Sequence, residues 1–134
     1  MSVFDTLRIA ASGLTAQRLR MDVAASNIAN QDSTRTVQGG PYQPESVVFS
    51  PLALGGTDAP GVAAVAILTP NRPPVRVYDP GNPDADATGF VLKPDVDVAA
   101  QMGDMMGAAR SYQLNATMVQ AAKQSALDAL ELGR

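Results

Sequence analysis

The sequence contains no cysteine and no histidine among its 134 residues. Without cysteine there is no disulfide framework, no thiolate nucleophile and no Cys-based metal site. Without histidine the chain lacks the commonest metal ligand and the usual general base near neutral pH. Aromatic residues make up only 4% of the chain, and alanine supplies much of the 46% apolar fraction. Because alanine buries little area and burial stabilises by roughly 25 cal/mol per Å², an isolated copy can build only a thin core.

The chain also lacks a basic face and a long apolar run. Its formal net charge of −3 argues against a nucleic-acid partner, which would need basic residues to neutralise phosphates. No apolar stretch approaches the roughly 20 residues that cross a bilayer. A cleaved signal peptide is not expected, because charged and polar residues interrupt the N-terminal stretch; they are Asp5, Arg8, Gln17 and Arg18. We therefore expect a soluble, non-enzymatic chain with no cofactor, metal site or small-molecule substrate.

Proline and glycine divide the chain into three regions. Residues 31–95 contain all ten prolines and seven of the eleven glycines, whereas residues 1–30 and 96–134 contain no proline. This distribution predicts two terminal helices that flank a turn-rich insert with β-hairpins. The predicted fold is mainly α with a small β insert. Residues 1–30 and 96–134 would form one discontinuous helical domain, and residues 31–95 the insert.

The N-terminal region carries a coiled-coil-like pattern of apolar residues. Ser2 and Asp5 predict a capping box at the start of the helix. Apolar residues then recur at a spacing of seven, with a second column midway between them, which is typical of a helix–helix seam. The members of this seam are Phe4, Leu7, Ala11, Leu14, Arg18, Met21, Ala25 and Ile28.

The C-terminal region has a seam of similar length. Asp95 or Asp97 is positioned to cap its first turn and Gly133 to end the helix. Residues of the seam alternate in steps of four and three: Val98, Met102, Met105, Ala109, Tyr112, Ala116, Val119, Lys123, Ala126 and Leu130.

The two seams most simply pair with each other, either as the core stripe of a monomer or as part of an assembly. We favour assembly, because two helices and a small insert cannot cover both sides of the pair. Arg18 and Lys123 would then fix register or partner at their seam positions, although solvated edge positions are an alternative. Gly103 and Gly107 would allow a neighbouring subunit to approach closely. The alternative is that they only destabilise the helix locally.

Asn27 and Asn30 lie one turn apart where the first helical pattern ends. An asparagine side chain donates and accepts hydrogen bonds, so it can pair with the backbone groups that a helix end leaves free. These groups belong either to the same helix or to a neighbouring subunit. We favour the neighbouring subunit.

The insert contains four short strand-like runs, at 46–49, 62–69, 75–78 and 90–92, separated by Gly- and Pro-rich turns. They predict a small antiparallel sheet or a pair of hairpins that packs against the helices or against neighbouring subunits. Asp79, Asp84 and Asp86 lie among these turns. They do not follow the ligand spacing of an EF-hand, and consecutive turns explain them better.

Several stretches resemble the rod–hook class of flagellar axial proteins. The N-terminal signature of that class is similar to Ser12-Gly13-Leu14-Thr15-Ala16-Gln17-Arg18 followed by Asn27-Ile28-Ala29-Asn30. Short rod subunits of the class are similar to this chain at Tyr78-Asp79-Pro80-Gly81-Asn82-Pro83, Ala85-Asp86-Ala87, Gly89-Phe90-Val91, Pro94-Asp95-Val96-Asp97-Val98, Arg110-Ser111-Tyr112-Gln113-Leu114-Asn115 and Ala122-Lys123. One departure is Gln31-Asp32-Ser33-Thr34-Arg35-Thr36, where many axial proteins have a Thr-Pro-Gly-Tyr-like turn.

The resemblance implies a structural subunit of the proximal rod in the bacterial flagellar basal body, within the periplasmic space. It further implies export through the flagellar type III apparatus without a cleaved signal peptide. The terminal helices would pair into a domain that stacks helically around the export channel and transmits torque. The implied partners are other copies of the chain, proximal and distal rod subunits, the rod–MS-ring junction protein and the export apparatus.

Two other classes remain open from the residues alone. A helical binding module or export adaptor would be a discrete folded species, whereas a rod subunit would have mobile termini before assembly. Strongly protected amides in the terminal helices of the free chain would therefore contradict the rod interpretation. An enzyme or metal protein would have to use the Asp cluster at 79–86, and a Ca²⁺ titration without binding would dismiss the metal version.

Overall fold

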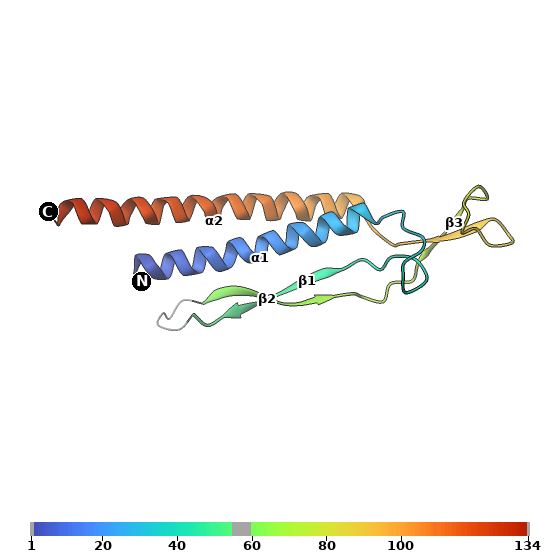
Figure 1. The fold of residues 1–134 in the computed structure, drawn as a ribbon, viewed down its shortest axis with the longest axis horizontal. Coiled ribbons are helices and arrows are strands. Elements are labelled where there is room, and N and C mark those ends of the chain that lie inside the picture. The colour runs from blue at the N-terminus through green and yellow to red at the C-terminus, as the bar shows by residue number, and fades with distance from the viewer. Residues whose placement is uncertain (1, 55–59, 134) are drawn as a thin grey trace.

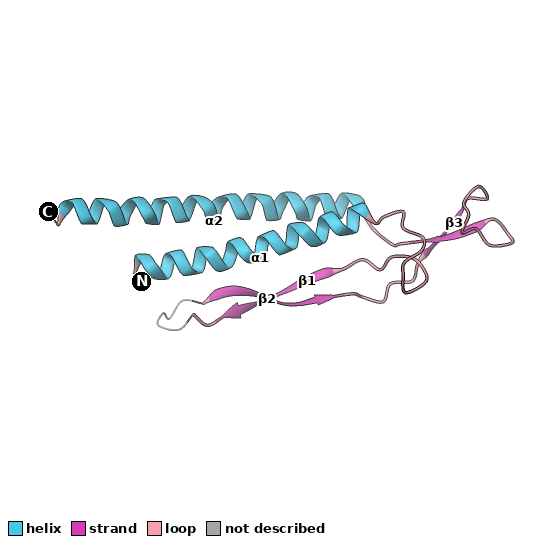
Figure 2. Ribbon diagram, viewed as in Figure 1, coloured by secondary structure: helices cyan, strands magenta, loops and turns pink. Residues whose placement is uncertain are grey.

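The structure is a computed structural model that describes residues 2–54 and 60–133. Two long helices, α1 (Val3–Ala29) and α2 (Val98–Leu132), run antiparallel to each other. The insert between them forms two antiparallel hairpins, β1 (Ser46–Leu52) with β2 (Gly61–Leu68) and β3 (Val75–Tyr78) with β4 (Phe90–Lys93). The predicted fold, mainly α with a β-hairpin insert between paired terminal helices, is confirmed (Figures 1 and 2).

Both helices begin at the predicted caps. The Ser2 backbone N–H donates to Asp5 Oδ2 at 2.8 Å, and the Asp5 N–H donates to Ser2 Oγ at 3.3 Å, which completes the capping box. At the start of α2, Asp97 Oδ1 accepts from the Ala100 N–H at 3.1 Å. Asn30 and Gly133 are the C-caps of the two helices. Local sequence chemistry therefore fixes where each helix starts and ends.

The four predicted strand runs match β1 to β4 within a few residues at their ends. The first hairpin has a register shift, a β-bulge, between Val48 and Phe49. The second pairs Val75 with Lys93 and Tyr78 with Phe90. The predicted turn at Gly55-Gly56 lies outside the described residues. Of the two layouts expected from the sequence, the pair of separate hairpins is the one observed.

The first hairpin packs along α1, so α1 lies between the hairpin and α2 (Figure 1). Ser12 on α1 joins the two layers, because its Oγ accepts from the Val62 N–H at 3.1 Å and donates to the Ile9 carbonyl at 2.7 Å. The second hairpin lies beyond the helix ends, beside the segment that follows α1. A salt bridge of 2.9 Å from Lys93 Nζ to Asp32 Oδ1 ties β4 to that segment.

The core of the chain consists of small residues. Apart from Pro44 and Pro94, the buried apolar side chains in the described ranges are five alanines and two valines: Ala10, Ala16, Val23, Ala24, Val91, Ala108 and Ala122. No leucine, isoleucine, phenylalanine or methionine within these ranges is buried. Because small side chains contribute little apolar area, the helix pair has few stabilising contacts of its own. The large apolar side chains lie at partly or fully exposed positions instead.

Candidate assembly surface

Three contacts fix the register of α1 against α2. A Cβ added at Gly13 would lie 2.8 Å from Asn115 Nδ2, so the two helices approach closely there. Arg20 forms a salt bridge with Asp104, and Asn27 Nδ2 donates to Gln101 Oε1 at 2.9 Å. The α1 members of these contacts, Gly13, Arg20 and Asn27, recur every seven positions. A matching column on α2 also has a spacing of seven and contains no exposed residue: Gln101, Ala108, Asn115 and Ala122.

The predicted seam lies one residue further along each helix than these contacts. On α1, Leu7, Leu14, Met21 and Ile28 are half-buried, whereas Phe4, Ala11, Arg18 and Ala25 are exposed. On α2, Val98, Met105, Tyr112, Ala116, Val119 and Ala126 are half-buried, whereas Met102, Ala109, Lys123 and Leu130 are exposed. One residue is about 100° around a helix. Most of the predicted seam therefore lies beside the helix–helix contact, and its burial against another subunit stays a prediction.

We call this side of the helix pair the open flank, defined by Leu7, Leu14, Met21 and Ile28 on α1 and Met102, Ala109, Ala116 and Leu130 on α2. Its central part is a groove of about 350 Å³ lined by Arg18, Met21, Asp22 and Ala25 from α1 and by Met105 and Tyr112 from α2. The first hairpin packs against a different side of α1, where Val23 lines a cavity together with Ser46 and Val47 of β1. The open flank is thus an apolar surface that the described part of the chain leaves uncovered.

Asn27 joins three segments of the chain at the end of α1. Its side chain is fully buried. Nδ2 donates to the Glu45 carbonyl at 2.8 Å and to Gln101 Oε1 at 2.9 Å. Oδ1 accepts from the Glu45 N–H and from the Tyr42 hydroxyl, both at 2.9 Å. These four bonds fill the capacity of an amide side chain, and they hold the start of the insert and the start of α2 against α1.

The expectation that Asn27 reaches a neighbouring subunit is therefore wrong, because its hydrogen bonds are complete within its own chain. Asn30 also bonds locally: its Nδ2 donates to the Ser26 carbonyl at 2.9 Å, and its Oδ1 accepts from Ser33 Oγ at 3.0 Å. Sequence reasoning missed Tyr42 and Glu45. Neither has a distinctive local pattern, and only folding brings them to Asn27.

Gly103 and Gly107 lie on the outer part of α2. Both are exposed, and a Cβ added at either would meet no atom within 4 Å. Each glycine costs roughly 1 kcal/mol relative to alanine inside a helix, and no described contact offsets that cost. Close approach of another subunit at these positions stays a prediction.

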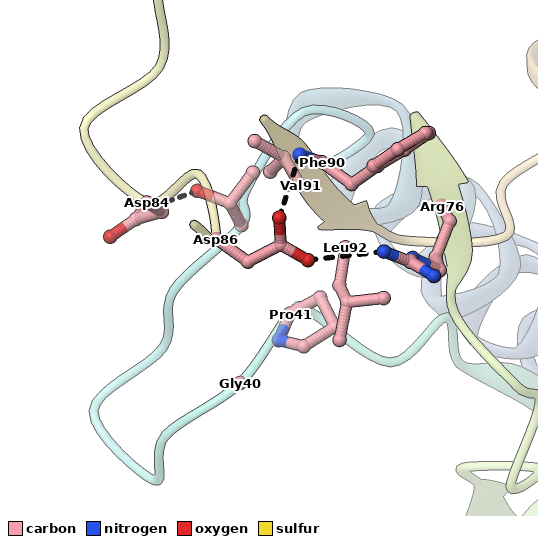
Figure 3. A pocket seen from close by; sticks show the side chains of 9 residues that line it. Gly40, Pro41, Arg76, Asp84, Asp86, Phe90, Val91 and Leu92 are labelled. Carbon is pink, nitrogen blue, oxygen red and sulfur yellow. Dashed lines mark hydrogen bonds and ion pairs between the residues drawn. The ribbon is translucent and has the colours of Figure 1, made fainter. Parts of the chain in front are cut away.

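Asp86 organises the turn between β3 and β4. Its Oδ1 accepts from the Thr88 N–H at 2.8 Å, from Thr88 Oγ1 at 2.6 Å and from the Phe90 N–H at 3.0 Å. Its Oδ2 pairs with Arg76 at 3.1 Å, and the Arg76 guanidinium stacks over the Phe90 ring. Figure 3 shows the carboxylate between Phe90 and Arg76, at the edge of an open cavity of about 420 Å³. The turn interpretation of this acidic stretch is confirmed.

These contacts have a pH-dependent consequence. The hydrogen bonds from the Thr88 side chain and the Phe90 N–H, with the nearby Arg76 charge, lower the pKa of Asp86 to about 2. Because the folded pKa is depressed, the stabilisation is present above the unfolded value of about 4 and is lost as pH falls through about 2. We expect the Phe90 amide resonance to titrate near pH 2, and this step to vanish in Asp86→Asn. A midpoint near pH 4 would contradict this prediction.

In the ranges 2–54 and 60–133, no group of three or more Asp or Glu side chains lies close enough together to hold a metal ion. Neither α1 nor α2 combines the length and apolar character that a membrane-spanning helix needs.

Comparisons with known proteins identify the family. The family model described as "Flagella basal body rod protein" matches residues 7–35, and the one described as "Flagellar basal body rod FlgEFG protein C-terminal" matches residues 87–132. The flagellar basal-body rod protein FlgC of Escherichia coli O157:H7 is 42% identical over 134 residues and all of both chains. FlgC of Salmonella typhimurium is also 42% identical over both full chains, and FlgC of Bacillus subtilis is 38% identical over both full chains.

The chain belongs to the FlgC family of flagellar basal-body rod proteins. Its membership confirms the predicted resemblance and places the chain in a class of structural rod proteins. The two family models cover most of α1, including Asn27, the C-cap Asn30 and all of α2. Both strands of the first hairpin lie outside the two matches. The paired helices and the segments that connect them to the insert are therefore the part of this FlgC-family chain that matches the two general rod-protein models.

Proposed function

We propose that the chain is a non-enzymatic subunit of the proximal rod, which polymerises through its terminal helices into a tube around the export channel and transmits torque. Residues 1–30 and 96–134 form the assembly domain in this proposal, and residues 31–95 form the insert that contacts neighbours further out. The chain reaches the basal body, in the periplasmic space, through the flagellar type III apparatus without a cleaved signal peptide.

The observation that carries this proposal is the placement of the large apolar side chains. On α2, Met102, Met106, Leu114, Met118, Leu127 and Leu130 are between 45% and 72% exposed. Soluble monomers rarely leave so many apolar side chains in contact with water, and such surfaces mark interaction sites. Methionine adapts to neighbours of different shape, as contacts with both identical and non-identical rod subunits require.

The partners of this surface follow from the family. We propose contacts with other copies of the chain, with proximal and distal rod subunits, and with the protein that joins the rod to the MS ring. Arg18 and Lys123 lie on the exposed part of the predicted seam and would select among these partners by charge. Gly103 and Gly107 would admit a neighbouring helix at short distance.

Removal of the chain tests this function. A bacterium without it is expected to be non-motile, and its isolated basal bodies are expected to lack the rod beyond the point where this subunit enters. The wild-type chain, supplied in the same cells, should restore both the rod and swimming. Normal swimming in the absence of the chain would contradict the proposal.

A further inference from the structure

The C-terminal end of α2 extends beyond the helix with which it pairs. The contacts of Asn27 with Gln101 and of Gly13 with Asn115 set Val3, the first residue of α1, opposite Ser125. Residues 126–132 therefore have no partner on α1, as the projecting end of α2 in Figure 1 shows. At 1.5 Å per residue they form an overhang of roughly 10 Å, or two turns.

The overhang has one apolar and one acidic side. Leu127 and Leu130 are 45% and 70% exposed. They are three residues apart and therefore share a face of the helix. Asp128 and Glu131 are also three residues apart and are exposed, one residue further around the helix. A short amphipathic segment of this kind suits an apolar groove with a basic edge.

The open flank provides such a groove on the same molecule. Met21, Met105 and Tyr112 line its centre, and the methionines can adapt to an inserted side chain. Arg18 lies at its edge, is exposed, and forms no ion pair with a described residue. Asp22 also lines the groove, so only the part near Arg18 is complementary to an acidic segment.

A chain cannot place its own overhang in its own groove. Given the register of the helices, Leu130 lies roughly 34 Å along the axis from Met21. The groove and the overhang are also different surfaces. A contact between two different surfaces is heterologous, and it leaves one free groove and one free overhang after each addition. Such a contact propagates a ring or a helical filament.

We propose that the overhang of one copy packs into the open flank of a second copy, with Leu127 and Leu130 against Met21, Met105 and Tyr112, and with Asp128 and Glu131 toward Arg18. This inference rests on the proposed function and names the segments that meet. Each copy then donates its C-terminus to one neighbour and receives the C-terminus of another.

The absence of cysteine permits a direct test by disulfide formation. Basal bodies are isolated from cells whose only copy of the chain is the double variant Leu130→Cys, Met21→Cys, and they are then oxidised. A disulfide requires Cα atoms within about 7 Å, so every bridge joins two copies. The expected result on a non-reducing gel is a ladder of dimers, trimers and longer products. The matched control, Leu130→Cys with Thr15→Cys on the hairpin side of α1, should give none.

Two single variants produced together sharpen the test. Leu130→Cys and Met21→Cys on separate copies should give dimers and no longer product, whereas either single variant alone should remain uncross-linked. A ladder in the Thr15 control, or no bridge in basal bodies that contain the double variant, would overturn the inference and leave the proposed function standing. Finding wild-type chain absent from the basal bodies would overturn the proposed function itself.

Discussion

Replacing Asn27 with alanine is expected to lower the free energy for opening the junction between α1, the insert and α2 by about 3 kcal/mol. The side chain is fully buried and makes four hydrogen bonds to Tyr42, Glu45 and Gln101. Alanine leaves the N–H and carbonyl of the half-buried Glu45 without these partners, and an unsatisfied group away from water costs more than a bond contributes. The effect is large because three segments separate together.

Amide hydrogen exchange in the free chain measures this loss. The Tyr42 N–H is a suitable reporter, because it donates to the Ser33 carbonyl at 3.0 Å and the substitution does not remove that acceptor. Its exchange is expected to become about 100-fold faster, since a factor of ten corresponds to roughly 1.4 kcal/mol.

Asn30→Ala is the matched control for Asn27→Ala. Asn30 is only half-buried and its side chain bonds to Ser26 and Ser33 of its own segment, so its removal should cost about 1 kcal/mol or less. Equal effects of the two substitutions would contradict the assigned role of Asn27.

Replacing Leu14 with aspartate is expected to abolish swimming and to remove the chain from isolated basal bodies. Leu14 lies half-buried on the open flank, so in the free chain the new carboxylate stays in contact with water. When a neighbouring helix covers the flank, the carboxylate loses that water without gaining a partner. Burial of an unpaired charge costs several kcal/mol, which corresponds to a loss of affinity of about 100-fold or more.

The adjacent substitution Thr15→Asp separates assembly from folding and charge. Thr15 is exposed on the same turn of α1, and its replacement adds the same charge outside the flank. Cells with Thr15→Asp should swim, and both free variants should keep the same helical circular dichroism. Normal swimming with Leu14→Asp would show that the flank does not face another subunit.

Features that depend on neighbouring residues could be predicted from the sequence. The capping box of Ser2 and Asp5 and the cap at Asp97 follow from side chains three residues from their partners. The strands follow from apolar runs bounded by proline and glycine. These elements form wherever the local chemistry favours them, so the fold class was accessible without long-range information.

The register of the helix pair could not be predicted from the sequence. Leu7, Leu14 and Met21 are large apolar residues of α1 spaced seven apart, and a periodic pattern assigns them to the contact between the helices. The contact instead uses Gly13, Arg20 and Asn27, which resemble a solvent-exposed column by composition. Gly13 lets the two helices approach closely, and Arg20 and Asn27 form polar contacts across the pair. The larger apolar side chains remain on the open flank.

The Asn27 junction depends on residues that are distant in the sequence. Tyr42 and Glu45 follow Asn27 by 15 and 18 positions, and Gln101 by 74. No local pattern links an asparagine at a helix end to those partners. A single sequence predicts that Asn27 bonds to backbone groups but does not identify the segment that provides them.

A three-dimensional reconstruction of the basal body that contains this chain tests the central claim most directly. We predict that Leu14, Met21, Met102 and Ala109 contact a helix of a neighbouring subunit, while Asn27 keeps its bonds to Tyr42, Glu45 and Gln101 within its own chain. A map in which these four flank residues face solvent or the export channel would contradict this account of assembly.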